Sequence, residues 1–451
     1  MRLGCFVFFL ICCFCSSFGQ ALGRGIPTIQ NYTKHDYAAE TQNWDIAEDR
    51  RGLKYFGNNL GLLEFDGTYW RTYPLPNRSI LRSIAVAPSG RIYVGGQDEV
   101  GYFEPADNGR LEFHSLLAKL PEDKRNTEDV WQTIIREDGV YFGTYRYLFR
   151  FRDEQLSMWE SETKFEGLFE ANDKLYVAEE GKSVQFLEDE NLQSLAGTEP
   201  LVDWMVRSIL PAGNDSLLIA TEENGAFFWS NGQIIPFQSE IQQFLIENRV
   251  YCATQLSNGQ YAIGTSHNGL LILDRSAKPL QNINKAYGLQ NNSILSVQEG
   301  KDGNLWLGLE NGIAFVELNS SFSYLNAHLG IEGTAYSARV HAGKLYLATN
   351  QGVYARDWVR PPNPLAQVSF QQIAGTRGAN WNLQILGEEL MLSRHDGTAR
   401  IDDYQTTVLS DLEGSWKISR LASYPAFAIE GKYNGLCLYK RNPGTKTWRF
   451  V

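Results

Sequence analysis

The sequence predicts an all-β protein, a β-propeller of four-stranded blades with one seven-bladed ring and about three blades of an incomplete second ring. A unit of three strands, joined by a tight turn and a polar loop, recurs along the whole chain. Its strand residues alternate with period two or run continuously apolar, and only residues 115–120 show a short helical period. The 41 Gly and the 13% of aromatic residues suit many short strands joined by tight turns.

The repeat is clearest where the turn Asp302-Gly303 leads into an apolar strand that ends at Gly308. The turn glycine moves from Gly52 to Gly303 in six steps, about 42 residues per repeat, which is the length of a propeller blade. Ten repeats exceed the four to eight blades of one ring. We therefore expect an N-terminal strand or lead-in over 20–40, seven blades over 41–322 and three further blades over 323–451. Three blades cannot close a ring, so either the chain is a piece of a longer protein or the repeat count is in error.

Residues 1–19 predict a secretory signal peptide. Arg2 precedes an apolar run from Cys5 to Cys15, and the small residues Ser17 and Gly19 suggest cleavage before Gln20. The apolar run is too short to span a bilayer. We therefore expect an exported, periplasmic protein. Outside this segment only Cys252 and Cys437 remain, and they are interpreted as buried structural thiols because two isolated cysteines form no disulfide framework.

The segment Asp302 to Ile313, Asp-Gly-Asn-Leu-Trp-Leu-Gly-Leu-Glu-Asn-Gly-Ile, resembles the two-component-regulator propeller repeat. That repeat builds the extracytoplasmic sensor of bacterial regulators, many of them from Bacteroidetes. The opening of the chain, including Asn43-Trp44 and residues 55–67, resembles the subgroup with a triple-tyrosine module after the propellers. The resemblance covers nearly all of the chain after the signal peptide.

This resemblance implies a ligand-binding sensor that acts in signal transduction and transcriptional regulation. In that family two seven-bladed propellers precede an immunoglobulin-like module, a membrane helix and a kinase or helix-turn-helix output. In this chain the family's pattern stops after the third blade of the second ring. We find no transmembrane segment after the signal, no kinase motif and no DNA-binding helix pair, so we expect the output domains to be absent from this chain.

Propeller topology places the starts of the inner strands around one mouth of the central channel, where ligands commonly bind. Counting eight residues back from most of the repeat turns reaches large aromatic or Arg residues, with Leu295 as an apolar exception and Trp416 in the last repeat. Aromatic faces stack on sugar rings, and Arg forks pair with anions. The alternative is that the Trp side chains pack between blades and the Arg side chains make structural hydrogen bonds. The loops between the second and third strands end at the same mouth, and there Tyr145-Arg146 replaces the usual glycine-containing loop. With Trp204, which stands just before Arg207, the predicted ligand-binding residues are Trp44, Arg82, Trp131, Tyr145, Arg146, Trp204, Arg207 and Tyr251.

Charge and motifs argue against several other functions. A net charge of −11 disfavours nucleic acid or anionic lipid as a partner of this portion. We find no metal-binding His pair, no nucleophile elbow and no phosphate loop, so we expect no metal, no cofactor and no enzymatic activity. The leading hypothesis is an extracytoplasmic sensor for a saccharide or another small ligand, and a homodimer is left open. The alternatives are a polysaccharide-acting lyase or hydrolase, and a protein-interaction scaffold.

Overall fold

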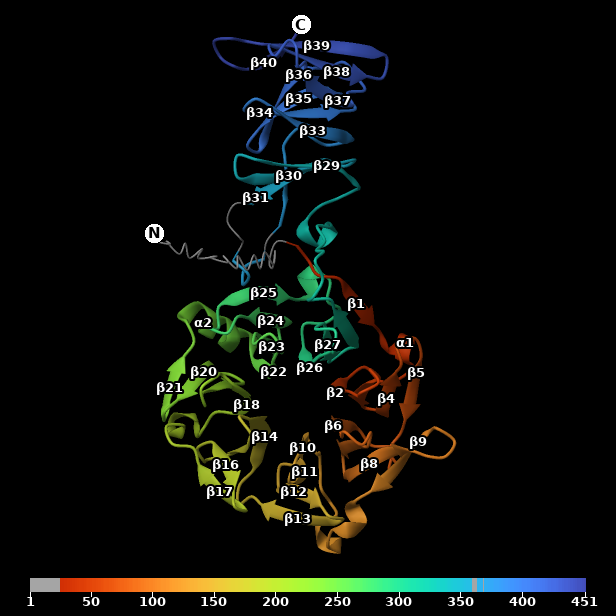
Figure 1. The fold of residues 1–451 in the computed structure, drawn as a ribbon, viewed down its shortest axis with the longest axis vertical. Helices are drawn as coiled ribbons and strands as arrows, with labels where there is room; N and C mark the ends of the chain where they lie inside the picture. The colour runs from red at the N-terminus through yellow and green to blue at the C-terminus, as the bar shows by residue number, and fades with distance from the viewer. Residues whose placement is uncertain (1–24, 359–362, 368) are drawn as a thin grey trace, which may run out of the picture.

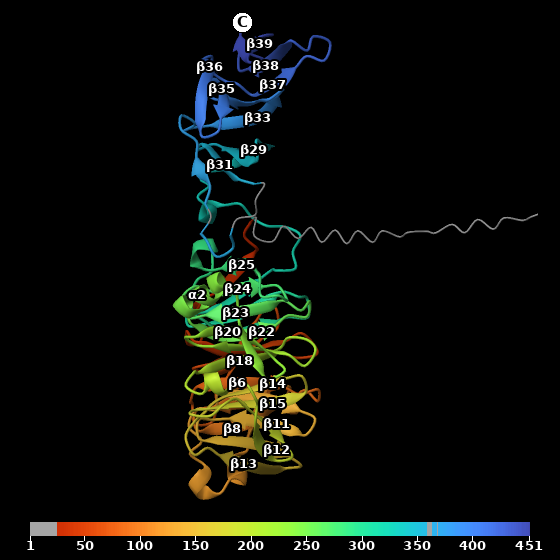
Figure 2. The same cartoon turned by 90° about the vertical axis from the view of Figure 1, so that its left-hand side faces the viewer.

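The computed structural model describes residues 25–358, 363–367 and 369–451, and the predicted signal peptide lies outside them. Across these residues the chain forms ten antiparallel sheets of four strands. Seven sheets surround a common centre as a ring, and the other three follow one another away from the ring's edge (Figure 1). Seen from the side, the ring is a flat disc (Figure 2). The predicted all-β propeller fold is therefore confirmed.

Each blade of the ring runs from an inner strand at the centre to an outer strand at the rim (Figure 1). The first four blades contain β2 (Asn43–Glu48), β3 (Lys54–Asn58), β4 (Gly61–Phe65) and β5 (Trp70–Tyr73); β6 (Leu81–Val86), β7 (Ile92–Gly96), β8 (Glu99–Pro105) and β9 (Leu111–Ser115); β10 (Gln132–Arg136), β11 (Gly139–Gly143), β12 (Tyr147–Arg152) and β13 (Gln155–Glu160); and β14 (Phe165–Ala171), β15 (Lys174–Glu179), β16 (Gln185–Glu188) and β17 (Asn191–Ser194). The next three contain β18 (Val206–Pro211), β19 (Leu217–Thr221), β20 (Gly225–Ser230) and β21 (Gln233–Pro236); β22 (Val250–Gln255), β23 (Tyr261–Thr265), β24 (Leu270–Leu273) and β25 (Pro279–Ile283); and β26 (Ile294–Glu299), β27 (Leu305–Leu309), β28 (Ile313–Val316) and β1 (Ile29–Tyr32).

The seventh blade takes its outer strand from the start of the described chain. Strand β1 pairs antiparallel with β28, with Ile29 opposite Val316 and Tyr32 opposite Ile313. The Tyr32 ring stacks on Trp306 of β27 at a centroid distance of 5.8 Å. Inner strands β2 and β26 pack against each other. The ring is therefore closed by joining its first and last segments within one blade.

The glycine that ends the second strand of the repeat is explained by close packing between blades. A Cβ placed on Gly308 would lie 2.4 Å from the carbonyl oxygen of Asn43 in the next blade, too close for any side chain. At Gly95 it would lie 2.4 Å from Val130 Cγ1 of the following blade. The second strands are mostly apolar, as in β27, where all five residues are buried. The blades therefore pack face to face through their apolar second strands, and the glycines allow the closest approach between neighbouring blades.

Helical structure is confined to connections in the described residues. The longest helix is α2 (Ser239–Asn248), which the periodicity analysis did not predict. It buries Ile241, Phe244 and Leu245, an i, i+3, i+4 pattern too brief to stand out in the sequence. The predicted helical turn at 115–120 is the 3-10 turn η1 (Leu117–Lys119). The remaining short helices are α1 (Lys34–Tyr37), η2 (Glu122–Lys124), η3 (Glu199–Leu201), η4 (Lys285–Tyr287) and η5 (Ala327–Leu329).

Three blades continue beyond the ring. They contain β29 (Ala335–His341), β30 (Lys344–Thr349), β31 (Val353–Asp357) and β32 (Gln371–Gln372); β33 (Asn380–Leu386), β34 (Glu389–Arg394), β35 (Gly397–Asp402) and β36 (Gln405–Ser410); and β37 (Lys417–Arg420), β38 (Phe427–Lys432), β39 (Gly435–Arg441) and β40 (Trp448–Phe450). We call these blades the array. An apolar cluster with Ile26 and Leu329 joins the array to the ring. Nowhere in the part of the chain described is a helix long and apolar enough to cross a membrane.

Candidate functional site

A register shift near the start of the inner strand recurs in six of the seven blades of the ring. One residue is left without a partner across the hairpin, the signature of a β-bulge. Bulges re-aim a side chain, here at the end of the strand that faces the channel. The bulged residues are Trp44, Arg82, Glu166, Arg207, Tyr251 and Leu295. In the third blade Trp131 directly precedes β10, and its backbone N–H donates to the Gly143 oxygen at 2.8 Å.

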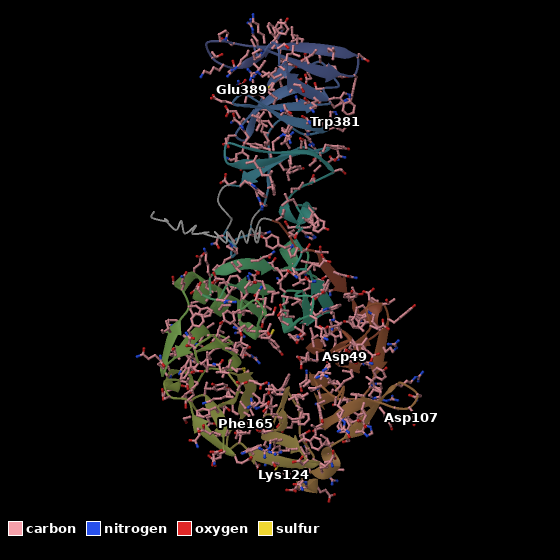
Figure 3. All side chains as sticks on the ribbon, viewed as in Figure 1. Asp49, Asp107, Lys124, Phe165, Trp381 and Glu389 are labelled. Atoms are coloured by element: carbon pink, nitrogen blue, oxygen red, sulfur yellow. The ribbon has the colours of Figure 1, made fainter. Side chains whose placement is uncertain are left out.

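All seven of these side chains line one cavity at the ring's centre. Its volume is about 330 Å³, and each blade contributes at least one residue to its wall. This volume lies within the usual range for small-molecule sites. Figure 3 shows side chains from the inner strands reaching toward the middle of the ring. The repeated bulge therefore produces a single site with a different side chain from each blade.

Arg82 lies in a corner formed by two indole rings. Its guanidinium carbon is 4.1 Å from the Trp44 ring centroid and 4.5 Å from that of Trp131. The two rings are 6.0 Å apart and nearly perpendicular, at 77°. The Arg82 Nε donates to Asp129 Oδ1 at 2.8 Å. Cation–π contact and the ion pair thus hold this cation in place at the cavity wall.

Arg207 stands over the ring of Tyr251, with its guanidinium carbon 5.0 Å from the ring centroid. Its Nε and Nη2 both donate to Glu222 Oε2, the former at 3.0 Å. Burial raises the pKa of Tyr145 and of Tyr251, the latter to about 12, while the positive charges of Arg207 and Arg82 oppose that rise. The charges of both arginines therefore lower the pKa of the same two phenols, Tyr145 and Tyr251.

Two carboxyl groups face the same cavity. Burial raises the pKa of Asp45 to about 7, although its carboxylate accepts backbone N–H bonds from Ile84 at 2.7 Å and Ile46 at 2.8 Å. Burial also raises the pKa of Glu166, against the opposing charges of Lys164 and Arg207. Sequence analysis missed both groups. Asp45 directly follows Trp44, and Glu166 belongs to a degenerate repeat whose turn, Asn172-Asp173, lacks the glycine used for counting.

The structure brings most of the predicted ligand-binding residues together. Five of the eight line the cavity, namely Trp44, Arg82, Trp131, Arg207 and Tyr251. Tyr145 lies beside it, with its ring 5.6 Å from that of Trp131. Arg146 lies outside it and pairs with Glu160 at 2.8 Å, and Trp204 packs on Phe227 at 5.5 Å in a blade core. The function of all eight in ligand binding stays a prediction.

The array repeats the bulge with aromatic residues. Tyr336 and Trp381 occupy the register shifts of β29 and β33, and Trp416 directly precedes β37. Trp381, labelled in Figure 3, stacks on Trp416 at 5.3 Å and meets Tyr336 edge-on at 5.1 Å. Counting back from the turns reached Trp416 but missed the other two. The array thus has an aromatic cluster where the ring has its cavity.

The thiol and metal chemistry of the cavity is limited. Cys252 lies in its wall, and burial raises the pKa of this thiol to about 12, so it stays protonated and a poor nucleophile at neutral pH. Cys437 is a free buried thiol in the core of the last blade. Among the residues described, no group of three or more His, Cys, Asp or Glu side chains could hold a metal ion.

One repeat of the chain, residues 288–311, matches the family of the two component regulator propeller. The fold is similar to the extracellular domain of a hybrid two component system from B. thetaiotaomicron, with 17% identity over 92% of this chain and 59% of that chain, and a TM-score of 0.66. A one component system's extracellular domain from the same organism gives 17% identity over 94% and 60%, with a TM-score of 0.53. The chain thus spans about three fifths of the length of both. Virginiamycin B lyase from Staphylococcus aureus gives 12% identity over 64% and 99%, with a TM-score of 0.50.

No curated protein matches the chain by sequence. At these identities the solved structures establish the fold alone, while the family match establishes the repeat. Together they confirm the resemblance to the two-component-regulator propeller that the Asp302 to Ile313 segment indicated.

Proposed function

We propose that this chain is an extracytoplasmic sensor propeller of a bacterial regulator, and that the ring cavity binds a saccharide or another small ligand without turning it over. One observation carries the proposal. Every blade of the ring delivers a side chain to a single cavity of about 330 Å³. A core that only stabilised the ring would be filled by apolar side chains, whereas this cavity has indoles, a phenol, guanidinium groups and carboxyl groups beside the apolar residues of its lining.

The chemistry of the wall suits a sugar ring. Trp44, Trp131 and Tyr251 offer aromatic faces, on which the C–H face of a sugar packs. Arg207 and Glu166 offer hydrogen-bonding groups for hydroxyls along the same wall. Sites of this kind combine an apolar surface with a few placed polar groups. Export to the periplasm would place the cavity where extracellular saccharides arrive.

A polysaccharide-acting enzyme is the second candidate. The raised pKa values of Asp45 and Glu166 favour it, because perturbed carboxyls in a cleft can act as general acid or base. The propeller fold is shared by lyases and by regulator domains, so it does not decide between them. Product formation from a bound oligosaccharide would favour the enzyme, and binding without turnover would favour the sensor.

The test is a thermal-shift screen of the protein from Gln20 onward against neutral and acidic oligosaccharides. Ligand at a hundred times its Kd adds about 2.7 kcal/mol of stability, a rise in Tm of roughly 5 °C for a ring of this size. We expect Trp131→Ala to abolish the shift. Trp159→Ala is the matched control, because this indole lies on the outer strand β13 and donates to the Glu190 carbonyl. A shift that survives Trp131→Ala would refute the proposed site.

A further inference from the structure

The lining of the ring cavity contains charged groups from four blades. Asp45 comes from β2, Arg82 from β6, Glu166 from β14 and Arg207 from β18. Asp129, from the segment before β10, pairs with Arg82, and Glu222, from the loop after β19, pairs with Arg207. Each of the two cations is thus paired with a carboxylate that lies outside the cavity lining. Asp45 and Glu166, which do line the cavity, have no cation within ion-pair distance in the described residues.

Arg207 has an unused edge. A guanidinium has five N–H donors, and Glu222 takes bonds from Nε and Nη2 only. Across the described residues no hydrogen bond engages Nη1, and the side chain keeps 27% of its surface exposed. The free edge of an Arg fork is a preferred partner for a carboxylate or a sulfate.

Arg82 is the second cation of the cavity lining and is more buried than Arg207. Its side chain is only 10% exposed, and Nη1 is buried with no hydrogen-bond partner among the residues described. An unpaired buried donor is costly, and part of this cost is offset by the two indole faces. Because both arginines act on Tyr145 and Tyr251, their positive potential overlaps at the phenol side of the cavity.

We infer that the cavity selects a saccharide that carries a negatively charged group, a carboxylate or a sulfate, bound by Arg207 and supported by the charge of Arg82. This inference rests on the proposed function, since it names the ligand class of the same site. The aromatic residues hold the sugar ring, and the arginines discriminate the charged sugar from its neutral counterpart. Arginine forks pair with both anions, so the experiment must tell carboxylate from sulfate.

The two carboxyl groups make the binding of an anion depend on pH. An ionised Asp45 or Glu166 would repel the ligand. Burial raises the pKa of Asp45 to about 7, so this carboxyl can take up a proton near neutral pH, and burial also raises the pKa of Glu166. Arg82 and Cys252 stand near Asp45, while Lys164, Glu180, Arg207 and Glu222 act on Glu166. A bound anion raises both pKa values further. The affinity for an acidic saccharide therefore increases as the pH falls, about fivefold from pH 8 to pH 6 for a one-unit rise at Asp45.

The experiment is calorimetric titration of the protein with paired saccharides. Uronic-acid oligosaccharides are compared with their methyl esters, and sulfated oligosaccharides with their desulfated forms. We expect the charged member of one pair to bind at least tenfold more tightly than its neutral partner, and the pair that does so identifies the anion. Arg207→Met should weaken the charged member at least tenfold and the neutral member by much less. Arg400→Met is the matched control, because Arg400 is also 27% exposed and paired with a glutamate, Glu389, but lies in the array.

The outcomes separate the inference from the proposed function. Equal affinity for charged and neutral members, or equal weakening of both by Arg207→Met, overturns the inference and leaves saccharide binding in place. Tighter binding of the acidic member at pH 8 than at pH 6 also overturns it. Failure of every saccharide to bind the folded protein overturns the proposed function itself.

Discussion

Asp45 places an ionisable group where other blades use uncharged ones. In several blades the side chain of the residue after the bulge accepts a hydrogen bond from the inner strand of the next blade. The Ser208 hydroxyl accepts the Ala253 N–H at 2.9 Å, and Ser337 accepts the Leu383 N–H at 3.1 Å. Asp45 does the same for the Ile84 N–H at 2.7 Å. These hydrogen bonds connect neighbouring blades. Replacing Asp45 by Asn therefore tests what the negative charge of Asp45 costs at such a connection.

The magnitude follows from the pKa of Asp45. Burial raises it from 3.8 to about 7, and three units correspond to about 4 kcal/mol in favour of the neutral carboxyl. A carboxyl whose pKa is raised by folding contributes stability below its unfolded pKa and loses it as pH rises through the folded pKa. At pH 8 the wild type therefore bears a cost of about 4 kcal/mol that Asn does not. The Asn amide can accept only one of the two N–H bonds, which costs about 1–2 kcal/mol.

We therefore expect Asp45→Asn to stabilise the protein by about 2–3 kcal/mol at pH 8 and to destabilise it by about 1–2 kcal/mol at pH 4. Urea denaturation of both proteins across this pH range measures the difference. The control is Asp66→Asn, because Asp66 also accepts two backbone N–H bonds, from Thr68 and Tyr69, but in an exposed turn. There the bonds lower the pKa of Asp66, so this variant should lose stability at pH 7. An Asp45→Asn protein less stable than wild type at pH 8 would refute the reasoning.

Two further predictions concern ring closure and the last blade. Tyr32→Ala should reduce the free energy of unfolding by about 2 kcal/mol in urea denaturation, because it removes the stack on Trp306. Tyr69→Ala, at a residue 68% exposed, should change nothing, and equal losses would contradict the closure role of β1. Glu430→Gln should destabilise the last blade by about 3–5 kcal/mol, because it leaves the buried ammonium of Lys432, 3.2 Å away, without its counter-charge. Hydrogen exchange over β37–β40 measures this loss, and unchanged protection would contradict it.

The architecture of the ring was predictable because glycines with a structural role recur in the repeat. The turn glycine marks most of the hairpins, and the glycine at the end of the second strand marks close packing between blades, as at Gly308. Both recur at a fixed period, so a single sequence reveals them. The pairing of β1 with β28 was not predictable, because no local pattern in Ile29–Tyr32 names a partner strand at the far end of the ring. The fold of each blade is local, while the closure of the ring is not.

Counting eight residues back from each turn predicted the cavity residues wherever that count ended at the bulge of the inner strand. Trp44, Arg82, Arg207 and Tyr251 stand at bulges, and Trp131 takes the equivalent place in the third blade. Trp204 precedes the start of β18 by two residues and falls into the blade core instead. Arg146 turns away on its loop to reach Glu160. Both residues lie in connections outside the strands, where the strand repeat does not fix the direction of a side chain.

The bulge separates the residues that hold neighbouring blades together from the residues that line the cavity. Gly308 contacts the neighbouring blade, and so do Ser208 and Asp45, which directly follow a bulge. These contacts fix the spacing of the inner strands. Within the described part of the chain, no hydrogen bond joins a bulged side chain of the ring to the backbone of a neighbouring blade, and these side chains line the cavity. The identity of the bulged side chain can therefore vary from Trp to Arg to Glu without changing how the blades stack. A seven-membered ring built in this way places one such side chain from each blade around a single cavity, where some contact one another, as Arg82 contacts Trp44 and Trp131. The aromatic cluster of Tyr336, Trp381 and Trp416 repeats this arrangement in the array.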